Sequence, residues 1–143
     1  MTMTYDEKKQ WLWRYRESIH REKELSDEVK ELRERAYNVS PALTGMPGGS
    51  SDGQALPRAV ESITRAQQEL ECQINMCGAI RREIVETIEQ VTNARDHEIL
   101  RRRYLLGQKL EKISVEMNYD FRYVCKRHKI SVCKLDIESD KKT

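Results

Sequence analysis

The chain has 143 residues, of which 35% are charged and 38% hydrophobic, and its net charge is +2. The length fits one domain or two small ones, and the composition suits a helical protein with long solvated faces and a limited core. No apolar run approaches the ~20 residues of a membrane span. Charges also occupy residues 1–13, where a secretory signal would be apolar, so we expect a cytoplasmic protein without a membrane segment.

The first predicted element is a long helix over about residues 5–37. Its apolar residues recur at steps of mostly three and four, the spacing of one helical face, while Glu, Lys and Arg occupy the other faces. This face comprises Leu12, Tyr15, Ile19, Leu25, Val29, Leu32 and Ala36. Residues 38–56 break the pattern with Pro, Gly, Ser and Asn, which predicts a loop.

The second predicted element is a helix over about residues 57–93, with Pro57 suited to its first position. A heptad seam of the coiled-coil type runs along it. The seam comprises Val60, Ile63, Gln67, Leu70, Ile74, Cys77, Arg81, Ile84, Ile88 and Val91. Two helices of similar length joined by a loop predict an antiparallel helical hairpin over residues 1–94.

The hairpin has apolar surface that it cannot bury alone. Tyr5, Trp11 and Trp13 lie off the main seam and need cover, either from the C-terminal segment or from a second chain. We expect a homodimer formed through the hairpin. Gly78 lies mid-helix, and counting back from the loop places it near Tyr15 and Trp13, so we expect it to make room for one of those rings.

Residues 95–135 predict three short helices separated by two short turns, followed by a tail over residues 136–143. Gly107 and Asn118 fall at the turns, and both residue types accept the left-handed backbone found at many helix ends. Asp120 is placed to cap the third helix. The inward sides are apolar: Ile99, Leu100, Tyr104, Leu110, Ile113, Met117, Val124, Val132 and Leu135.

The same segment holds the positive charge of the chain. It carries 11 Lys and Arg against 5 Asp and Glu, a net charge of +6, whereas residues 1–94 carry −3. Three helices with this turn spacing are typical of helix-turn-helix proteins, whose last helix enters the major groove of double-stranded DNA. The alternative is a small helical bundle whose basic residues are merely solvated.

With Val124, Val132 and Leu135 turned inward, the third helix presents a set of outward residues that can read base edges. These base-facing candidates are Phe121, Arg122, Cys125, Lys126 and Lys129. A second basic set is placed to contact phosphates, which give affinity without sequence preference. These phosphate candidates are Arg101, Arg102, Arg103, Lys109 and Lys112.

Ile99-Leu-Arg-Arg-Arg-Tyr-Leu-Leu-Gly, followed by Leu110-Glu-Lys-Ile-Ser-Val-Glu-Met-Asn-Tyr, resembles region four of bacterial sigma factors. With Leu32-Arg-Glu-Arg-Ala, Met46-Pro-Gly-Gly-Ser and the second long helix, residues 25–135 resemble small phage and prophage proteins of Gram-positive bacteria, similar in layout to the ArpU and RinA late transcription regulators. Arg127 departs from this pattern, standing at a usually apolar position. The resemblance implies a sigma-like helix-turn-helix domain after the hairpin and a transcription regulator that acts in the bacterial host.

Three functions remain open from the sequence. The first is a regulator that binds promoter or operator DNA, with contact to host RNA polymerase. The second is a DNA-packaging or assembly protein, such as a small terminase subunit, and the third is a pure interaction protein. We expect no enzyme and no cofactor, because no nucleophile–base pair or phosphate-cradling loop is present. The spacing of Cys125 and His128 is too weak a signal to predict a metal site.

Overall fold

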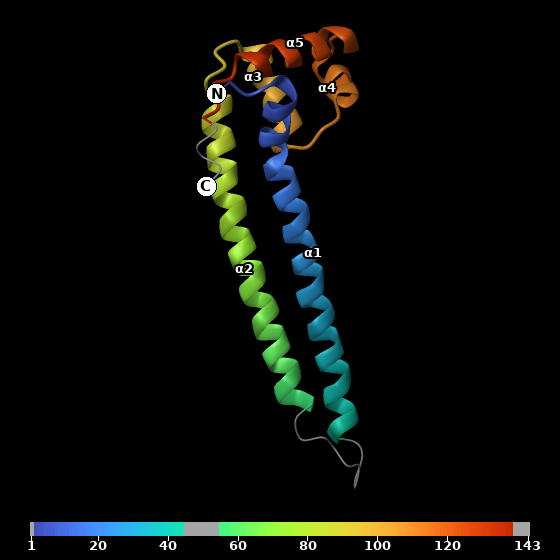
Figure 1. Cartoon of the computed structure of the whole chain (residues 1–143). Coiled ribbons are helices and arrows are strands. Elements are labelled where there is room, and N and C mark those ends of the chain that lie inside the picture. Colours follow the sequence, from blue (N-terminus) through green and yellow to red (C-terminus); the bar gives the residue numbers. More distant parts are fainter. Residues whose placement is uncertain (1, 45–54, 139–143) are drawn as a thin grey trace. The chain divides into compact units, whose positions relative to one another are not determined.

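The computed structural model describes residues 2–44 and 55–138, and every regular element in these ranges is helical, as expected (Figure 1). Within the same ranges, no helix has the length and apolar character needed to cross a membrane. A π-helical turn, η1, directly continues the third helix. The elements are α1 (Tyr5–Thr44), α2 (Ala55–Ile88), α3 (Ala94–Leu100), η1 (Arg101–Leu105), α4 (Leu110–Met117) and α5 (Phe121–Lys134).

The two long helices begin and end differently from the expectation. α1 runs to Thr44 instead of residue 37, and α2 covers Ala55–Ile88 instead of 57–93. α2 ends early because a new helix is capped just after it: the side chain of Asn93 accepts hydrogen bonds from the backbone N–H groups of Arg95 and Asp96, at 3.0 and 3.1 Å. Residues 38–44 and 55–56 of the expected loop are therefore helical, and its remainder, with the Met46-Pro-Gly-Gly motif, lies outside the described residues.

The chain divides into two compact units, whose bounds lie at residues 18–19 and 76–77. We call Met1–Ser18 together with Cys77–Thr143 the terminal unit, and Ile19–Met76 the central unit. The first turns of α1 and the last turns of α2 thus belong with α3, α4 and α5, which gather over them in Figure 1. Each unit is described separately below.

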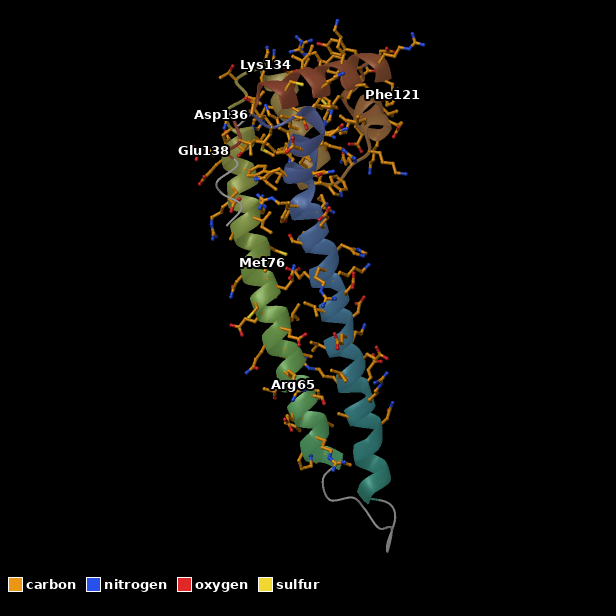
Figure 2. The ribbon with its side chains drawn as sticks, viewed as in Figure 1. Arg65, Met76, Phe121, Lys134, Asp136 and Glu138 are labelled. Carbon is orange, nitrogen blue, oxygen red and sulfur yellow. The ribbon has the colours of Figure 1, made fainter. Side chains whose placement is uncertain are left out.

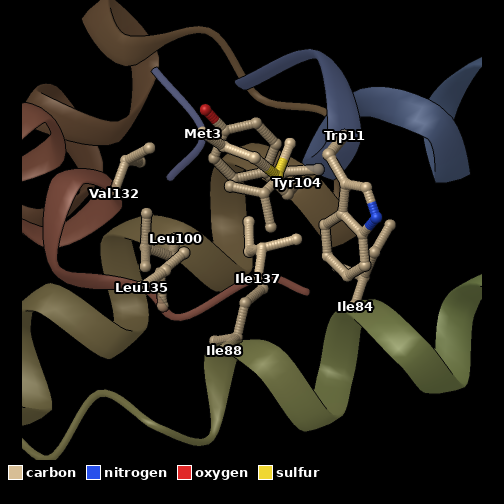
Figure 3. Packing of buried hydrophobic residues seen from close by; sticks show 10 residues of the cluster. Met3, Trp11, Ile84, Ile88, Leu100, Tyr104, Val132, Leu135 and Ile137 are labelled. Atoms are coloured by element: carbon tan, nitrogen blue, oxygen red, sulfur yellow. The ribbon is translucent and has the colours of Figure 1, made fainter. Parts of the chain in front are cut away.

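The main core of the terminal unit joins both ends of the chain (Figure 3). Trp11, which is only 4% exposed, belongs to this core together with residues of α2 and of the C-terminal segment. Ile137 belongs to the same core, so the compact structure continues past the expected end at residue 135. The cluster comprises Met3, Trp11, Leu12, Ile84, Ile88, Leu100, Tyr104, Val132, Leu135 and Ile137.

A second, smaller core holds α3, α4 and α5 together. Ile99, Ile113 and Val124 contribute one fully buried side chain each from these three helices, and Leu110 and Met117 pack against them. These are the inward residues that helical spacing predicted. Because their burial turns one side of α5 toward α3 and α4, it also determines which side of α5 is left exposed.

The central unit consists of one segment of α1 and one of α2. Leu25 and Val29 of α1 are buried, as is Ala66 of α2. Val60 and Ile74 of the expected heptad seam are instead 54% and 48% exposed. The contact stripe of α2 is therefore rotated toward Ala66, and one edge of the apolar face remains in water.

Gly78 does not make room for an aromatic ring, so that expectation was wrong. A Cβ atom built at Gly78 would meet only Nη1 of Arg82, at 3.9 Å, which is an ordinary contact. Trp13 and Tyr15 instead pack at the edge of the main core, and the ring of Trp13 meets that of Tyr104 edge-on, with centroids 6.2 Å apart. The glycine is thus a half-buried position within α2 that has room for a small side chain.

Candidate nucleic-acid interface

The exposed side of α5 carries a line of basic residues. Arg122, Lys126 and Lys129 recur at steps of four and three along one helical face, and all three are exposed. Phe121 lies at the first turn of the helix, 42% exposed (Figure 2). Cys125 differs from the other base-facing candidates, because it is half-buried and burial raises the pKa of its thiol.

The basic side chains of this face are not neutralised by any carboxylate that the structure describes. In the described part of the chain, no ion pair involves Arg122, Lys126 or Lys129. Lys129 has one aromatic contact, with its Nζ atom 5.6 Å from the ring centroid of Tyr5. The face can therefore meet an anionic partner without first breaking an internal ion pair.

The opposite side of α5 is fixed to α3 by a two-pronged ion pair. Nε of Arg127 donates to Oδ1 of Asp96 at 2.9 Å, and Nη2 donates to Oδ2 at 2.5 Å. Asp96 is buried, and the hydrogen bonds from Arg127 lower the pKa of its carboxyl group. At the position of Arg127, where the sigma-like pattern that the sequence resembles usually has an apolar residue, the chain thus makes a bidentate ion pair.

The neighbouring residue, His128, is buried between two tyrosines. Its Nε2 atom lies 2.7 Å from the hydroxyl of Tyr104, and its Nδ1 atom lies 3.2 Å from the hydroxyl of Tyr5. A neutral imidazole has one N–H group, so one tyrosine donates to the ring and the other accepts from it. Burial, together with the positive charges of Arg103 and Lys9, lowers the pKa of His128 to about 4. The ring thus joins α1, η1 and α5 in its neutral form.

A lysine in the first turn of α1 contacts the C-terminal end of α5. Lys8 is buried, and its Nζ atom donates to the carbonyl oxygens of Cys133 and Leu135, at 2.8 and 2.7 Å. A positive charge at this end also interacts favourably with the helix dipole. The contact holds the C-terminal end of α5 against α1.

The turn between α4 and α5 follows the expected chemistry in one respect and departs from it in another. Asn118 adopts the left-handed conformation with φ of 60°, and its N–H group bonds to the carbonyls of Ser114 and Val115. Asp120 occupies the N-cap position of α5, but its side chain makes no capping hydrogen bond. The carboxylate therefore lies exposed beside the first turn.

The run of three arginines expected to contact phosphates has partners inside the protein. Arg101 bonds through Nε to Glu98 at 2.6 Å, and Arg102 pairs with Glu116 and Glu98. Arg103 donates to the carbonyl of Gln108 at 3.1 Å, and its guanidinium lies 4.4 Å above the ring of Trp13.

The two lysines of the same set remain accessible. Lys109 is exposed at the start of α4, and Lys112 is exposed with its Nζ atom 3.8 Å from Glu116. The phosphate candidates thus separate into three arginines that have partners inside the protein and two lysines that are exposed.

Sequence reasoning missed an arginine–tyrosine cluster beside the α4–α5 turn. Nη1 of Arg95 donates to the hydroxyl of Tyr123 at 2.7 Å, and its guanidinium also approaches the ring of Tyr119, at 5.7 Å. The two tyrosine rings lie 5.4 Å apart. The sequence offered one sign of this cluster: Tyr119 and Tyr123 are four residues apart, one just before α5 and one in its first turn. This cluster adds a cation and two hydroxyls to the exposed region.

The spacing of Cys125 and His128 does not correspond to a pair of metal ligands. Both ring nitrogens of His128 face tyrosine hydroxyls. Over the described residues, no group of three or more His, Cys, Asp or Glu side chains is arranged to hold a metal ion.

The chain matches no protein-family model, no curated protein and no solved structure.

Proposed function

We propose that the protein is a phage or prophage transcription regulator that binds double-stranded DNA through α4 and α5, which act as a sigma-like helix-turn-helix. One observation carries the proposal: Arg122, Lys126 and Lys129 share an exposed face of α5 and have no carboxylate partner among residues 2–44 and 55–138. Arg127, His128 and Val124 pack on the other side of the helix. A rigid helix with a basic outer face is what entry into the major groove requires.

The roles on this helix follow from side-chain chemistry and position. Arg122, near the N-terminal end, bonds the O6 and N7 atoms of a guanine, and Phe121 contacts a thymine methyl group. Lys126 meets a base edge or a phosphate. Lys109 and Lys112, at the start of α4, contact phosphates and set the orientation of the module on the duplex.

The arginine run has a different role in this proposal. Arg102 pairs with Glu116 and so joins η1 to α4, and Arg103 bonds the carbonyl of Gln108 in the turn between them. Arg101 pairs with Glu98, three residues earlier on the same helical run. The functional form is a homodimer, which matches the two-fold symmetry of many regulatory sites, and host RNA polymerase is the expected protein partner.

Selection of bound fragments from fragmented phage and host DNA by the purified full chain tests the proposal. We expect a shared sequence among the selected fragments, and tight binding that falls steeply as salt rises. Equal affinity for all duplexes, or no binding at low salt, would contradict it. Solution mass separates regulation from DNA packaging, because packaging proteins of this kind form rings of eight or more chains.

A paired substitution locates the interface. Arg122→Ala with Lys126→Ala should weaken binding by about tenfold or more, since one bidentate arginine contact is worth roughly 1–3 kcal/mol. The salt slope should also fall by about 0.9 for each lost phosphate contact. The matched control, Arg35→Ala with Arg65→Ala, removes the same charge from exposed positions of the central unit and should change neither quantity.

A further inference from the structure

One side of the central unit carries a groove between its two helices, with a volume of about 820 Å³. Val29, Arg33 and Tyr37 of α1 form one wall, and Gln67 and Leu70 of α2 form the other. The groove is thus partly apolar, and it lies beside the contact stripe that joins α1 to α2.

Exposed apolar side chains continue this groove along α2. Val60, Gln67 and Ile74 are spaced by seven residues, so they lie on one face of the helix, and Gln67 places that face at the groove. Val60 and Ile74 are about half exposed, and Tyr37 on the α1 side is 76% exposed. Apolar surface therefore borders the groove on both helices, which marks the face as an interaction site.

The two edges of this face carry opposite charges. Lys30, Arg33 and Glu34 of α1 border the groove on one side, so this edge carries a net positive charge. Glu71 of α2 follows Gln67 by four residues and so flanks the apolar stripe on the other side. Within the described chain, the ion pairs of this unit join other residues, which leaves Lys30, Arg33 and Glu71 open to a partner.

We propose that a second copy of this chain covers this face, related by a two-fold axis parallel to the helices. In that arrangement α1 of each copy meets α2 of the other at the same height, so Lys30 and Arg33 face the partner's Glu71. A two-fold axis perpendicular to the helices would instead bring the two basic edges together. Gln67, the one polar residue in the stripe, fixes the register.

The size of the face suits a dimer. Residues 55–76 of α2 span about 33 Å at 1.5 Å per residue, and two adjacent helices are about 20 Å wide. The face therefore offers about 650 Å² per copy, close to the ~800 Å² per partner of a stable interface. The inference rests on the homodimer of the proposed function and gives that homodimer its contact surface.

Sedimentation equilibrium of the full chain is the first test. We expect a mass of twice 16.9 kDa at micromolar concentration. Val60→Asp with Ile74→Asp should weaken self-association by at least about tenfold, because four carboxylates would then enter the apolar interface. The single control Met76→Asp should leave it unchanged, since Met76 is as exposed as Val60 but borders a different groove with Arg21 and Cys72 (Figure 2). Circular dichroism confirms that each variant remains helical.

A charge reversal tests the relative orientation of the two copies. Arg33→Glu and Glu71→Arg should each weaken the dimer, and the chain carrying both changes should regain part of it, because the two reversed charges attract each other while Lys30 keeps its positive charge. The proposal would be overturned if the wild-type chain is a monomer or has the mass of a ring. It would also be overturned if Met76→Asp weakens self-association as much as the double variant, or if the double reversal restores no self-association. If the chain is a monomer that still selects DNA, the proposed interface is wrong but DNA binding is not. If the chain is a dimer that does not bind DNA, the interface is supported and the proposed function is wrong.

Discussion

Tyr104 and His128 stack in the core of the terminal unit, with ring centroids 5.6 Å apart and a hydrogen bond of 2.7 Å between the tyrosine hydroxyl and Nε2. His128 is 3% exposed, and Arg103 and Lys9 place positive charge nearby. Protonation would add a third positive charge and bury it. The folded protein therefore favours the neutral ring, which makes this contact sensitive to acid.

We expect stability to fall as the pH is lowered from about 6.5 toward 4. The pKa of His128 is lowered from 6.5 to about 4 in the folded chain, so the unfolded chain takes up this proton first. The contribution of neutral His128 to the free energy of unfolding is therefore complete above pH 6.5. It falls by about 3 kcal/mol in total as the pH is lowered to 4. Urea denaturation at pH 7.0, 6.0 and 5.0 measures the slope.

Two variants assign this slope to His128. His128→Gln should be less stable at pH 7 but should lose most of the slope between pH 7 and 5. His20→Asn, at an exposed position of the central unit, should retain it. An unchanged slope in His128→Gln would show that another group titrates.

The Arg127–Asp96 pair predicts an order of stability among three chains. Arg127→Met leaves the buried carboxylate of Asp96 without its two donors, whereas Arg127→Met with Asp96→Leu removes both charges. Because an unpaired buried charge costs more than a missing pair, the single variant should be less stable than the double. Denaturation midpoints of wild type, single and double at one pH test this order, and a double variant below the single would contradict it.

The same pair shows where sequence reasoning reaches its limit. The inward positions of α5 could be predicted, because Val124 and Val132 recur at helical spacing and no polar partner is needed to bury them. Arg127 could not be placed, since its inward orientation depends on a carboxylate 31 residues earlier, which no local pattern reveals. Arg102 was assigned to phosphates for the same reason, since its partner Glu116 lies 14 residues later and meets it only when the helices pack.

The long helices illustrate a second limit. Periodicity predicted that α1 and α2 exist, but it favoured the large residues Val60 and Ile74 as the contact stripe of α2. In the structure Ala66 is buried, because a small side chain lets two helices approach closely, while Val60 and Ile74 remain exposed. When the apolar stripe of a helix is wider than one helix–helix contact, either edge of it can pack against the other helix of the same chain. The spacing of the residues alone does not show which edge does so.

Replacing Gly78 should stabilise the protein. The position lies inside α2, and a Cβ atom there meets only Arg82, at 3.9 Å. Gly78→Ala should raise the free energy of unfolding by about 1 kcal/mol, because glycine loses more backbone entropy than alanine on forming a helix. Chemical denaturation measures the change. As a control, Ala79→Gly makes the reverse change at the exposed neighbouring position and should lower the free energy of unfolding by a similar amount.

Replacing Gly107 should have the opposite effect. Gly107 forms the turn between η1 and α4 with φ of +73°, where a residue with a Cβ atom costs roughly 1–2 kcal/mol. Its Cβ atom would also lie 2.6 Å from Nε of Arg16, whose Nη1 donates to the carbonyl of Leu105 at 2.9 Å. Gly107→Ala must therefore both strain the backbone and displace Arg16.

A double-mutant cycle separates these two costs of Gly107→Ala. In the Arg16→Ala background the side chain that would collide is absent, so Gly107→Ala should cost only the backbone strain, less than in wild type. Thermal unfolding of the four chains, wild type, both single variants and the double, gives the coupling. Equal costs in the two backgrounds would mean that Arg16 moves aside without loss, and a cost near zero in both would contradict the left-handed turn itself.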